Sequence, residues 1–243
     1  NKELTLEFAV NSLSFGNVSV GILSECYKRG LQPNVFLIGG NCDLSAQKPD
    51  DGFNQWLGHC INKAQRETCR RSTAIKLWHA NGSLSSYSET DSRLIVFHEL
   101  DQLTPTEVNI LRNQDKVYVT STFTQRVFKD YGVESEYLPL GFDSHNFHML
   151  IPRPKIDGAL QFAAGGKAEK RKGHDKLIRL WAKRYGGNFK YRLNLALHNP
   201  FLVRPNSPNP AEEAVANTRR FVADALEGKQ YDNIVMHPHM ATN

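Results

Sequence analysis

The chain has few cysteines, and their spacing excludes two kinds of site. The four thiols among 243 residues are Cys26, Cys42, Cys60 and Cys69, and no two of them form a CxxC pair. A disulfide scaffold needs a denser set of cysteines, and a structural zinc or dithiol redox site needs closely spaced pairs. The cysteine content therefore favours a reducing, cytoplasmic setting.

Long hydrophobic runs are also missing. No stretch approaches the roughly 20 consecutive apolar residues of a membrane-spanning helix, and the first residues lack the basic patch and apolar run of an export signal. We therefore expect no transmembrane segment. Hydrophobic residues make up 40% of the chain and charged residues 23%, a mixture that excludes collagen-like, low-complexity and disordered classes.

The sequence also lacks a convincing metal-ligand pattern. His237 and His239 flank a single proline, and no third ligand lies near them in the sequence. Because protein zinc sites take three or four side-chain ligands, we expect neither a metal nor any other cofactor.

Positive charge is concentrated in one part of the chain. The net charge is +5, but residues 1–150 carry 14 basic and 17 acidic side chains, whereas residues 151–243 carry 16 basic and 8 acidic ones. This asymmetry predicts that the second part meets an anionic partner.

Short apolar runs alternate with helical patterns over the first part of the chain. Strands are expected at residues 4–10, 35–38, 74–78, 94–97 and 116–120, and helices between Asn17 and Gly30 and at residues 53–66, 105–113 and 122–131. Short, continuously apolar strands are typical of buried parallel sheets. The alternation predicts an open, mostly parallel sheet with helices on both faces, whose ligands bind beyond the carboxyl ends of the strands.

A second βα unit follows a proline-containing linker at residues 141–157. Beyond it, strands are expected at residues 160–164, 192–197 and 233–236, and helices at residues 175–185 and 211–226. We therefore predict an α/β fold class with two Rossmann-like, doubly wound parallel-sheet domains, residues 1–148 and 149–243, of which the second is incomplete.

The segment from Gly165 to Gly173 has the residue types of a phosphate-binding loop. Two glycines are followed by Lys167 and then by a Lys-Arg-Lys run ending at Lys172, all between an expected strand and an expected helix. Glycines let the backbone approach an anion, lysines supply charge, and a helix N-terminus offers N–H groups. The spacing does not match a P-loop, and a solvated basic loop is the alternative interpretation.

Three residues of the first part are expected at the carboxyl edge of its sheet. Gly16 lies at the first strand-to-helix turn, where it brings the backbone close to a ligand or simply permits a tight turn. His98 and His79 each follow a strand closely, in the region where active sites of such sheets lie. For both histidines, a hydrogen bond at the strand end is the structural alternative.

Taken together, these segments resemble the GT-B glycosyltransferases, and among them the retaining family 4 enzymes (glycosyl transferase group 1). The matching segments are Ser14–Asn17, Ile95–His98, Val119–Ser121 together with Tyr137–Asp143 and Phe147, and Gly166–Gly173. The third of these resembles the family's "vS…yGv…ipnGvD…F" run and the fourth its "GrlxxxKG" loop. The resemblance covers nearly all of the chain.

The resemblance implies a hexosyl- or glycosyltransferase that moves a sugar from a nucleotide-diphosphate donor. By position, Lys167 and Lys172 would bind the donor diphosphate, with Lys167 replacing the commoner arginine, and Gly16 would let the first loop touch the donor. His98 would hydrogen-bond the transferred sugar as the catalytic residue. Further candidates of lower rank are Asn17, Arg171 and His79. Such enzymes need no enzymic nucleophile and no metal, because positioning and stabilisation of the leaving diphosphate supply the catalysis.

One departure from the family leaves alternatives open. The sequence stops before the family's Glu-x7-Glu segment, which binds the donor's sugar and nucleoside, so the donor half is expected to be incomplete. A non-catalytic remnant that binds a sugar nucleotide or a partner is therefore one alternative. The basic second part suggests another, a nucleic-acid binder or a transferase that acts on modified DNA bases. The acceptor stays open among a glycan, a lipid-linked sugar, a protein and a modified nucleic acid.

Overall fold

The computed structural model describes residues 3–48, 50–67, 70–142, 149 and 155–238. The described residues divide into two compact units, one within residues 3–142 and the other within residues 149–238. Each unit has its own sheet and its own buried core.

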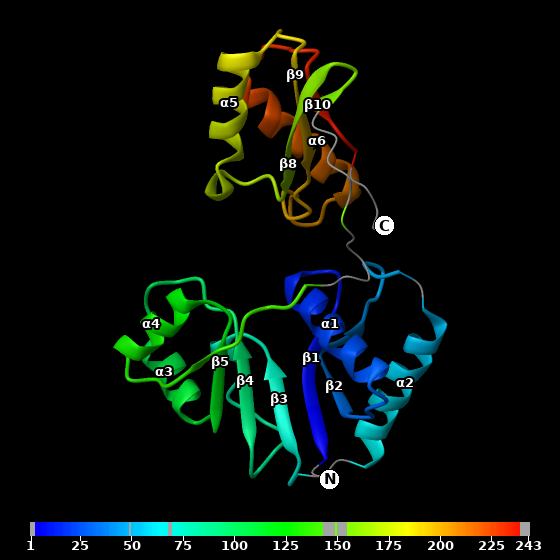
Figure 1. The fold of residues 1–243 in the computed structure, drawn as a ribbon, viewed down its shortest axis with the longest axis vertical. Coiled ribbons are helices and arrows are strands. Elements are labelled where there is room, and N and C mark those ends of the chain that lie inside the picture. The colour runs from blue at the N-terminus through cyan, green and yellow to red at the C-terminus, as the bar shows by residue number, and fades with distance from the viewer. Residues whose placement is uncertain (1–2, 49, 68–69, 143–148, 150–154, 239–243) are drawn as a thin grey trace. The chain divides into compact units, whose positions relative to one another are not determined.

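The first unit is built on a six-stranded parallel sheet (Figure 1). Its strands are β1 (Leu4–Val10), β2 (Asn34–Cys42), β3 (Thr73–Leu77), β4 (Ser92–Val96), β5 (Lys116–Val119) and β6 (Glu136–Tyr137). Every neighbouring pair in the order β2-β1-β3-β4-β5-β6 is parallel. The predicted mixed α/β, Rossmann-like sheet is confirmed here.

Helices cover both faces of this sheet. They are α1 (Ser14–Lys28), α2 (Asp51–Arg66), α3 (Pro105–Arg112) and α4 (Thr122–Asp130), with a 3-10 turn η1 (Ala80–Gly82). α1 and α2 pack against one side through a cluster that includes Phe8 and Leu77. α3 and α4 pack against the other side through a cluster that includes Leu94 and Val119. Alternate residues of each strand point to opposite faces, which is why one sheet separates two apolar clusters.

Local sequence signals fix where three of these helices begin. The Asp50 side chain accepts a hydrogen bond from the Phe53 N–H at the start of α2. Thr104 and Glu107 form a reciprocal capping box at α3, and Ser121 caps α4. Each cap satisfies an N–H group that has no partner inside the helix.

The strand order reverses between β1 and β3. The chain leaves β1 for β2 on one side and continues from β3 through β4 to β6 on the other. In open α/β sheets, the crevice beyond the carboxyl ends at such a reversal is the usual ligand site. The segments that follow β1 and β3 are therefore the first places to search for a site.

The second unit is a four-stranded sheet with the order β10-β9-β8-β7. Its elements are β7 (Lys155–Ile156), β8 (Ala159–Gly166), η2 (Lys170–Lys172), α5 (His174–Tyr185), β9 (Tyr191–Leu197), α6 (Pro210–Ala225) and β10 (Ile234–Met236). β8, β9 and β10 are parallel. Leu193 and Leu195 of β9 pack with Ile178 of α5 and Val222 of α6 in one apolar cluster.

Two predictions for the second unit differ from the structure. Within the described residues, its helices cover one face of the sheet, so the doubly wound arrangement is seen in the first unit alone. β7, which lies inside the predicted linker, pairs antiparallel with β8. The two-residue turn Asp157–Gly158 joins them with φ of 51° and 79°, which are values typical of a type I′ hairpin turn. Most of the other linker residues lie outside the described residues.

Other predicted boundaries move by a few residues, and two shifts concern the site. α1 begins at Ser14, so Gly16 and Asn17 lie in its first turn and not in a preceding loop. β8 continues through Gly165 and Gly166, so only the residues after them leave the strand. Among the described helices, none has both the length and the apolar character needed to cross a membrane.

Candidate functional site

The first turn of α1 lies against the end of β1. A Cβ on Gly16 would collide with the backbone of Asn11, so this position admits only glycine in the observed packing. The Asn11 side chain accepts a hydrogen bond from the Leu13 N–H and closes the turn. Gly16 is buried. Its small size is therefore used for contact between the helix and the strand end, which is the structural alternative that the sequence left open.

Aromatic rings gather where β1, β3 and β4 end. The ring of Phe15 lies 4.6 Å from that of His79, 4.7 Å from that of Phe97 and 5.3 Å from that of Trp78, measured between centroids. The residues come from the start of α1 and from the segments after β3 and β4. Such ring pairs are favourable beyond their buried area. The strand-order reversal is thus lined by aromatic side chains, of which His79 is exposed.

His98 lies two residues after β4 and is partly buried. Its Nε2 donates a hydrogen bond to the Gln102 carbonyl at 3.0 Å, and its ring packs at 5.5 Å from the ring of Phe128. Its own carbonyl accepts a hydrogen bond from the Thr124 hydroxyl at 2.8 Å. The imidazole is therefore held by its own loop and by α4, and the proton lies on Nε2 because a carbonyl can only accept.

The Asn17 side chain forms a hydrogen bond with Gln47 of the first unit. Its side-chain oxygen accepts a hydrogen bond from the Gln47 amide at 3.2 Å. This contact ties the first turn of α1 to the segment that follows β2. Asn17 is exposed. It is near the aromatic rings in the sequence, because Phe15 precedes it by two residues.

In the second unit, the loop after β8 presents Lys172 beside a glycine backbone. The Lys172 ammonium lies 3.7 Å from the place where a Cβ on Gly166 would stand. Gly166 and Gly173 have φ of 108° and 71°, a region that other residues rarely adopt. Within the described part of the chain, the Lys172 side chain has no ion pair or hydrogen bond.

The same loop leads directly into α5. Gly173 is the N-cap residue of α5, and no side chain caps this helix. The first N–H groups of a helix and its dipole attract anions when no side chain occupies them. Lys172, the Gly166 backbone and the start of α5 therefore offer charge, close approach and N–H donors within one short segment.

Lys167 and Arg171 are engaged differently from Lys172. The Lys167 ammonium lies over the ring of Phe201, 4.7 Å from its centroid, and 3.8 Å from a carboxylate oxygen of Glu169. Arg171 lies 3.3 Å from the other oxygen of Glu169. Because both pairs are partly exposed to water, they hold the side chains weakly. An arriving anion would compete with Glu169 for both cations.

A buried asparagine joins this loop to the loop after β9. Asn199 is 5% exposed; its amide donates to the Ala168 carbonyl at 3.1 Å, and its side-chain oxygen accepts from the Phe201 N–H at 3.1 Å. Backbone hydrogen bonds between the two loops add to this connection. Asn199 and Phe201 were not predicted as site residues. An Asn-Pro pair directly after a strand was the only signal for them.

The first turn of α5 contains unsatisfied polar atoms. His174 is 8% exposed and its Nδ1 has no hydrogen-bond partner among the described residues, and the same holds for Oδ1 of Asp175. Buried polar atoms are normally paired, since an unpaired one costs about 1–3 kcal/mol. These atoms mark the start of α5 as a place with unused hydrogen-bonding capacity.

The three described thiols are poor nucleophiles. Burial raises the pKa of Cys60 to about 11 and also raises the pKa values of Cys26 and Cys42. All three are free. The thiolate is the reactive form of cysteine, so these residues do not support covalent chemistry near neutral pH. No cluster of three metal-ligating side chains occurs within the described ranges.

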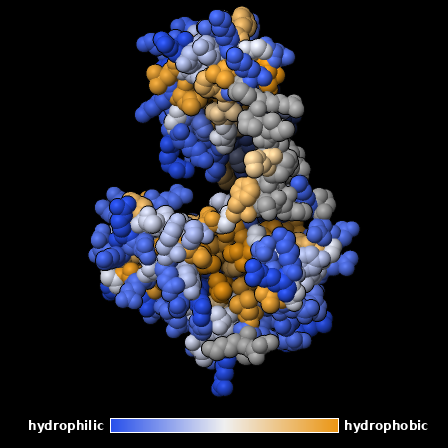
Figure 2. All heavy atoms as spheres, in the orientation of Figure 1, coloured by the Kyte–Doolittle hydropathy of each residue, from blue (hydrophilic) through white to orange (hydrophobic). Residues whose placement is uncertain are grey.

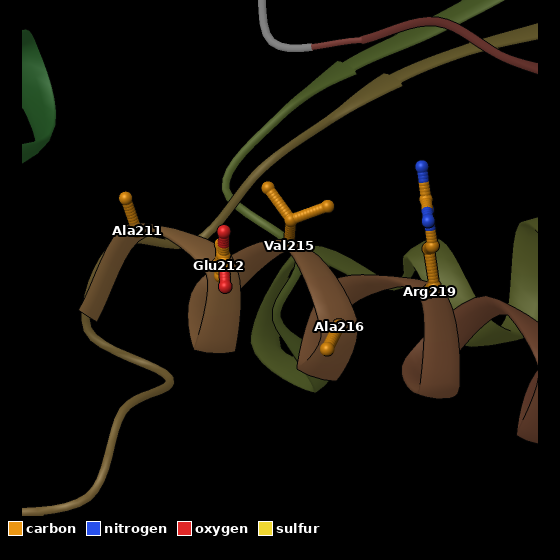
Figure 3. Close-up of a pocket in the computed structure, with 5 residues that line it drawn as sticks. All are labelled: Ala211, Glu212, Val215, Ala216 and Arg219. Atoms are coloured by element: carbon orange, nitrogen blue, oxygen red, sulfur yellow. The ribbon is translucent and has the colours of Figure 1, made fainter. Parts of the chain in front are cut away.

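A pocket of about 350 Å³ lies on the exposed side of α6 (Figure 3). Its lining residues are Ala211, Glu212, Val215, Ala216 and Arg219. Figure 3 shows that these side chains come from successive turns of one helix. None of them was predicted as a site residue, and the pocket has a single pair of opposite charges, so it offers no arrangement for chemistry.

The predicted site residues thus form two groups. Gly16, Asn17, His79 and His98 belong to the first unit, and Lys167, Arg171 and Lys172 to the second. Within the first group, the aromatic rings connect the neighbourhood of Gly16 with His79, whereas His98 turns towards Gln102 and α4. No model of a known protein family matches the chain, and no curated protein matches it either.

Proposed function

We propose that the chain is a retaining glycosyltransferase of the GT-B type, resembling family 4, that uses a nucleotide-diphosphate sugar. The observation that supports this most is the placement of the Lys172 ammonium against the Gly166 backbone at the uncapped start of α5. A diphosphate there meets several N–H donors and a cation that has no ion pair within the described part of the chain. Charge-assisted hydrogen bonds of this kind contribute about 1.5–3 kcal/mol each.

In this proposal the two units have different tasks. The second unit, residues 149–243, holds the donor diphosphate with Lys172 and Lys167, and Arg171 adds positive charge. The first unit, residues 1–148, receives the acceptor, and its His98 hydrogen-bonds the transferred sugar. No side chain acts as nucleophile and no metal or other cofactor takes part, because the lysines offset the charge that develops on the leaving diphosphate. The setting is cytoplasmic, in keeping with the free thiols.

Turnover of sugar nucleotides tests this function. A panel of uridine, guanosine and adenosine diphosphate sugars is incubated with the full chain, and release of the nucleoside diphosphate is followed. His98→Ala should lower the rate about a hundredfold, as loss of a transition-state donor does, while leaving affinity for the free nucleoside diphosphate unchanged. His59→Ala, an exposed histidine on α2, is the matched control and should retain full activity.

A second candidate is a protein that binds a sugar nucleotide without transferring the sugar. The engagement of the His98 Nε2 by the Gln102 carbonyl favours it, because this atom must leave its partner before it can contact a sugar. Tight binding of nucleoside diphosphates without turnover of any donor in the panel would support this candidate and contradict transfer.

A further inference from the structure

The solvent-facing side of α5 combines cations with exposed leucines. We define the α5 outer surface as Lys176, Leu177, Arg179, Leu180, Lys183 and Arg184, all of which are exposed. Leu180 is 65% exposed and Leu177 43%. The opposite side of the helix, with His174, Ile178 and Trp181, is buried. The two leucines therefore make little contribution to the core of their own unit.

Helical spacing surrounds Leu180 with positive charge. Residues three and four positions away are neighbours on a helix surface, and for Leu180 these are Lys176, Leu177, Lys183 and Arg184. No acidic residue belongs to this set. In the space-filling view, hydrophobic side chains appear among hydrophilic ones in the upper part of the molecule, where Figure 1 draws α5 (Figure 2).

The excess charge of the second part of the chain is concentrated in this segment. Residues 170–184 contain seven basic side chains and one acidic side chain, out of 16 and 8 in residues 151–243. Among the described residues, only one of the four cations of the α5 outer surface has an acidic partner, since Arg179 lies 3.7 Å from Glu227. A diphosphate at Lys172 leaves these four cations unused, because they follow it along the solvent side of the helix.

We propose that the α5 outer surface docks on an anionic phospholipid membrane. Leucines inserted between cations are the arrangement that suits a lipid interface, where apolar side chains enter the acyl boundary and cations meet headgroup phosphates. Nucleic acid would use the cations but gains little from exposed leucines, since bases are contacted by stacking and hydrogen bonds. The docking surface does not depend on the proposed transferase activity.

Vesicle co-sedimentation of the full chain tests the proposal. Wild type should sediment with vesicles of phosphatidylcholine mixed with phosphatidylglycerol, and not with phosphatidylcholine alone. Lys183→Gln/Arg184→Gln should weaken binding about thirtyfold, as expected for two cations near an anionic surface. Leu180→Ser and, independently, Leu177→Ser should weaken it about fivefold through lost apolar contact. Thermal unfolding of these exposed-site variants should match wild type.

The control variant removes the same charge from another helix of the same unit. Arg219→Gln/Arg220→Gln, on the exposed side of α6, should bind the mixed vesicles as wild type does. Three results would overturn the proposal: no sedimentation of wild type with the mixed vesicles, equal loss in the α5 and α6 charge variants, or wild-type binding by both leucine variants. Tighter binding to short duplex DNA than to vesicles would assign the surface to nucleic acid instead.

Discussion

The two units differ in the burial and pairing of some charged side chains: a buried ion pair in the first and exposed cations in the second. In the first unit, Glu7 of β1 and Lys76 of β3 form an ion pair at 2.8 Å with both side chains nearly buried. In the second, the cations of η2 and α5 are exposed and most lack an acidic partner among the described residues. Buried charges must be paired to be tolerated, whereas exposed ones are available to a ligand.

The two sheets also differ in how their faces are covered. Helices cover both faces of the first sheet, whereas within the described residues the second sheet has helices on one face. Its other face carries a row of polar side chains from β8, from β9 and from the residue after β10. Asn194 donates to the side-chain oxygen of Gln161 at 3.0 Å and accepts from His237 Nε2 at 2.9 Å. We infer that apolar burial stabilises the first unit more than the second.

The largest effect is expected from breaking the buried ion pair. Lys76→Met leaves the Glu7 carboxylate without its cation in the interior, so the free energy of unfolding of the first unit should fall by about 3–5 kcal/mol. Among the described residues, the Tyr87 N–H, at 2.9 Å, would remain as a hydrogen-bond donor to this carboxylate. Denaturant unfolding measures the loss. The double variant Glu7→Leu/Lys76→Met removes both charges and should recover most of it; failure to recover would show that the pair itself is not the cause.

A smaller effect is expected at the first turn of α1. Gly16→Ala places a methyl group against the Asn11 backbone and should destabilise the first unit by about 1–3 kcal/mol. Gly21→Ala is the matched control, because the same helix has open space there and alanine favours helix by about 1 kcal/mol. Thermal unfolding should therefore shift in opposite directions, and two equal shifts would contradict the close approach at Gly16.

The smallest effect is expected on the open face of the second sheet. Asn194→Ala removes the centre of the polar row, but water can replace its partners on this partly exposed face, so the cost should be about 1 kcal/mol. Amide hydrogen exchange of β8 and β9 should report the loss while β1 and β3 keep their protection. A loss of protection in both sheets would show that the units are not independently stable.

The order of strands and helices in the first unit followed from the sequence for β1 to β5, each of which contains a short apolar run. β6 (Glu136–Tyr137) was missed, because its two residues are exposed and form no apolar run. Runs such as Leu94–Phe97 are typical of a buried parallel strand. The strand order could not be predicted, because no residue of β3 indicates that this strand pairs with β1. The Asp157–Gly158 turn carried a local hairpin signal, but neighbouring prolines favoured a linker for the same residues.

From the sequence, the candidate site could be proposed only in its charged part. The glycines and lysines of residues 165–173 are the residue types of an anion site, with a solvated basic loop as the alternative. Asn199 and Phe201 come from a loop some 30 residues later, and their roles depend on hydrogen bonds that only the folded sheet creates. Similarly, the collision of a Cβ at Gly16 with Asn11 follows from three-dimensional packing, which no spacing in the sequence reveals.

Calorimetric titration at Lys172 tests the central claim most directly. Uridine and uridine diphosphate are titrated into wild type, Lys172→Ala and Lys190→Ala. Lys190 is the control, because it is exposed and lies just before β9, at the amino ends of the parallel strands and not at their carboxyl ends. Lys172→Ala should weaken binding of the diphosphate about tenfold or more, while Lys190→Ala should bind it as wild type does. Uridine should bind all three proteins with the same affinity. Equal diphosphate affinity in all three proteins, or no binding to wild type, would contradict a diphosphate site at the start of α5.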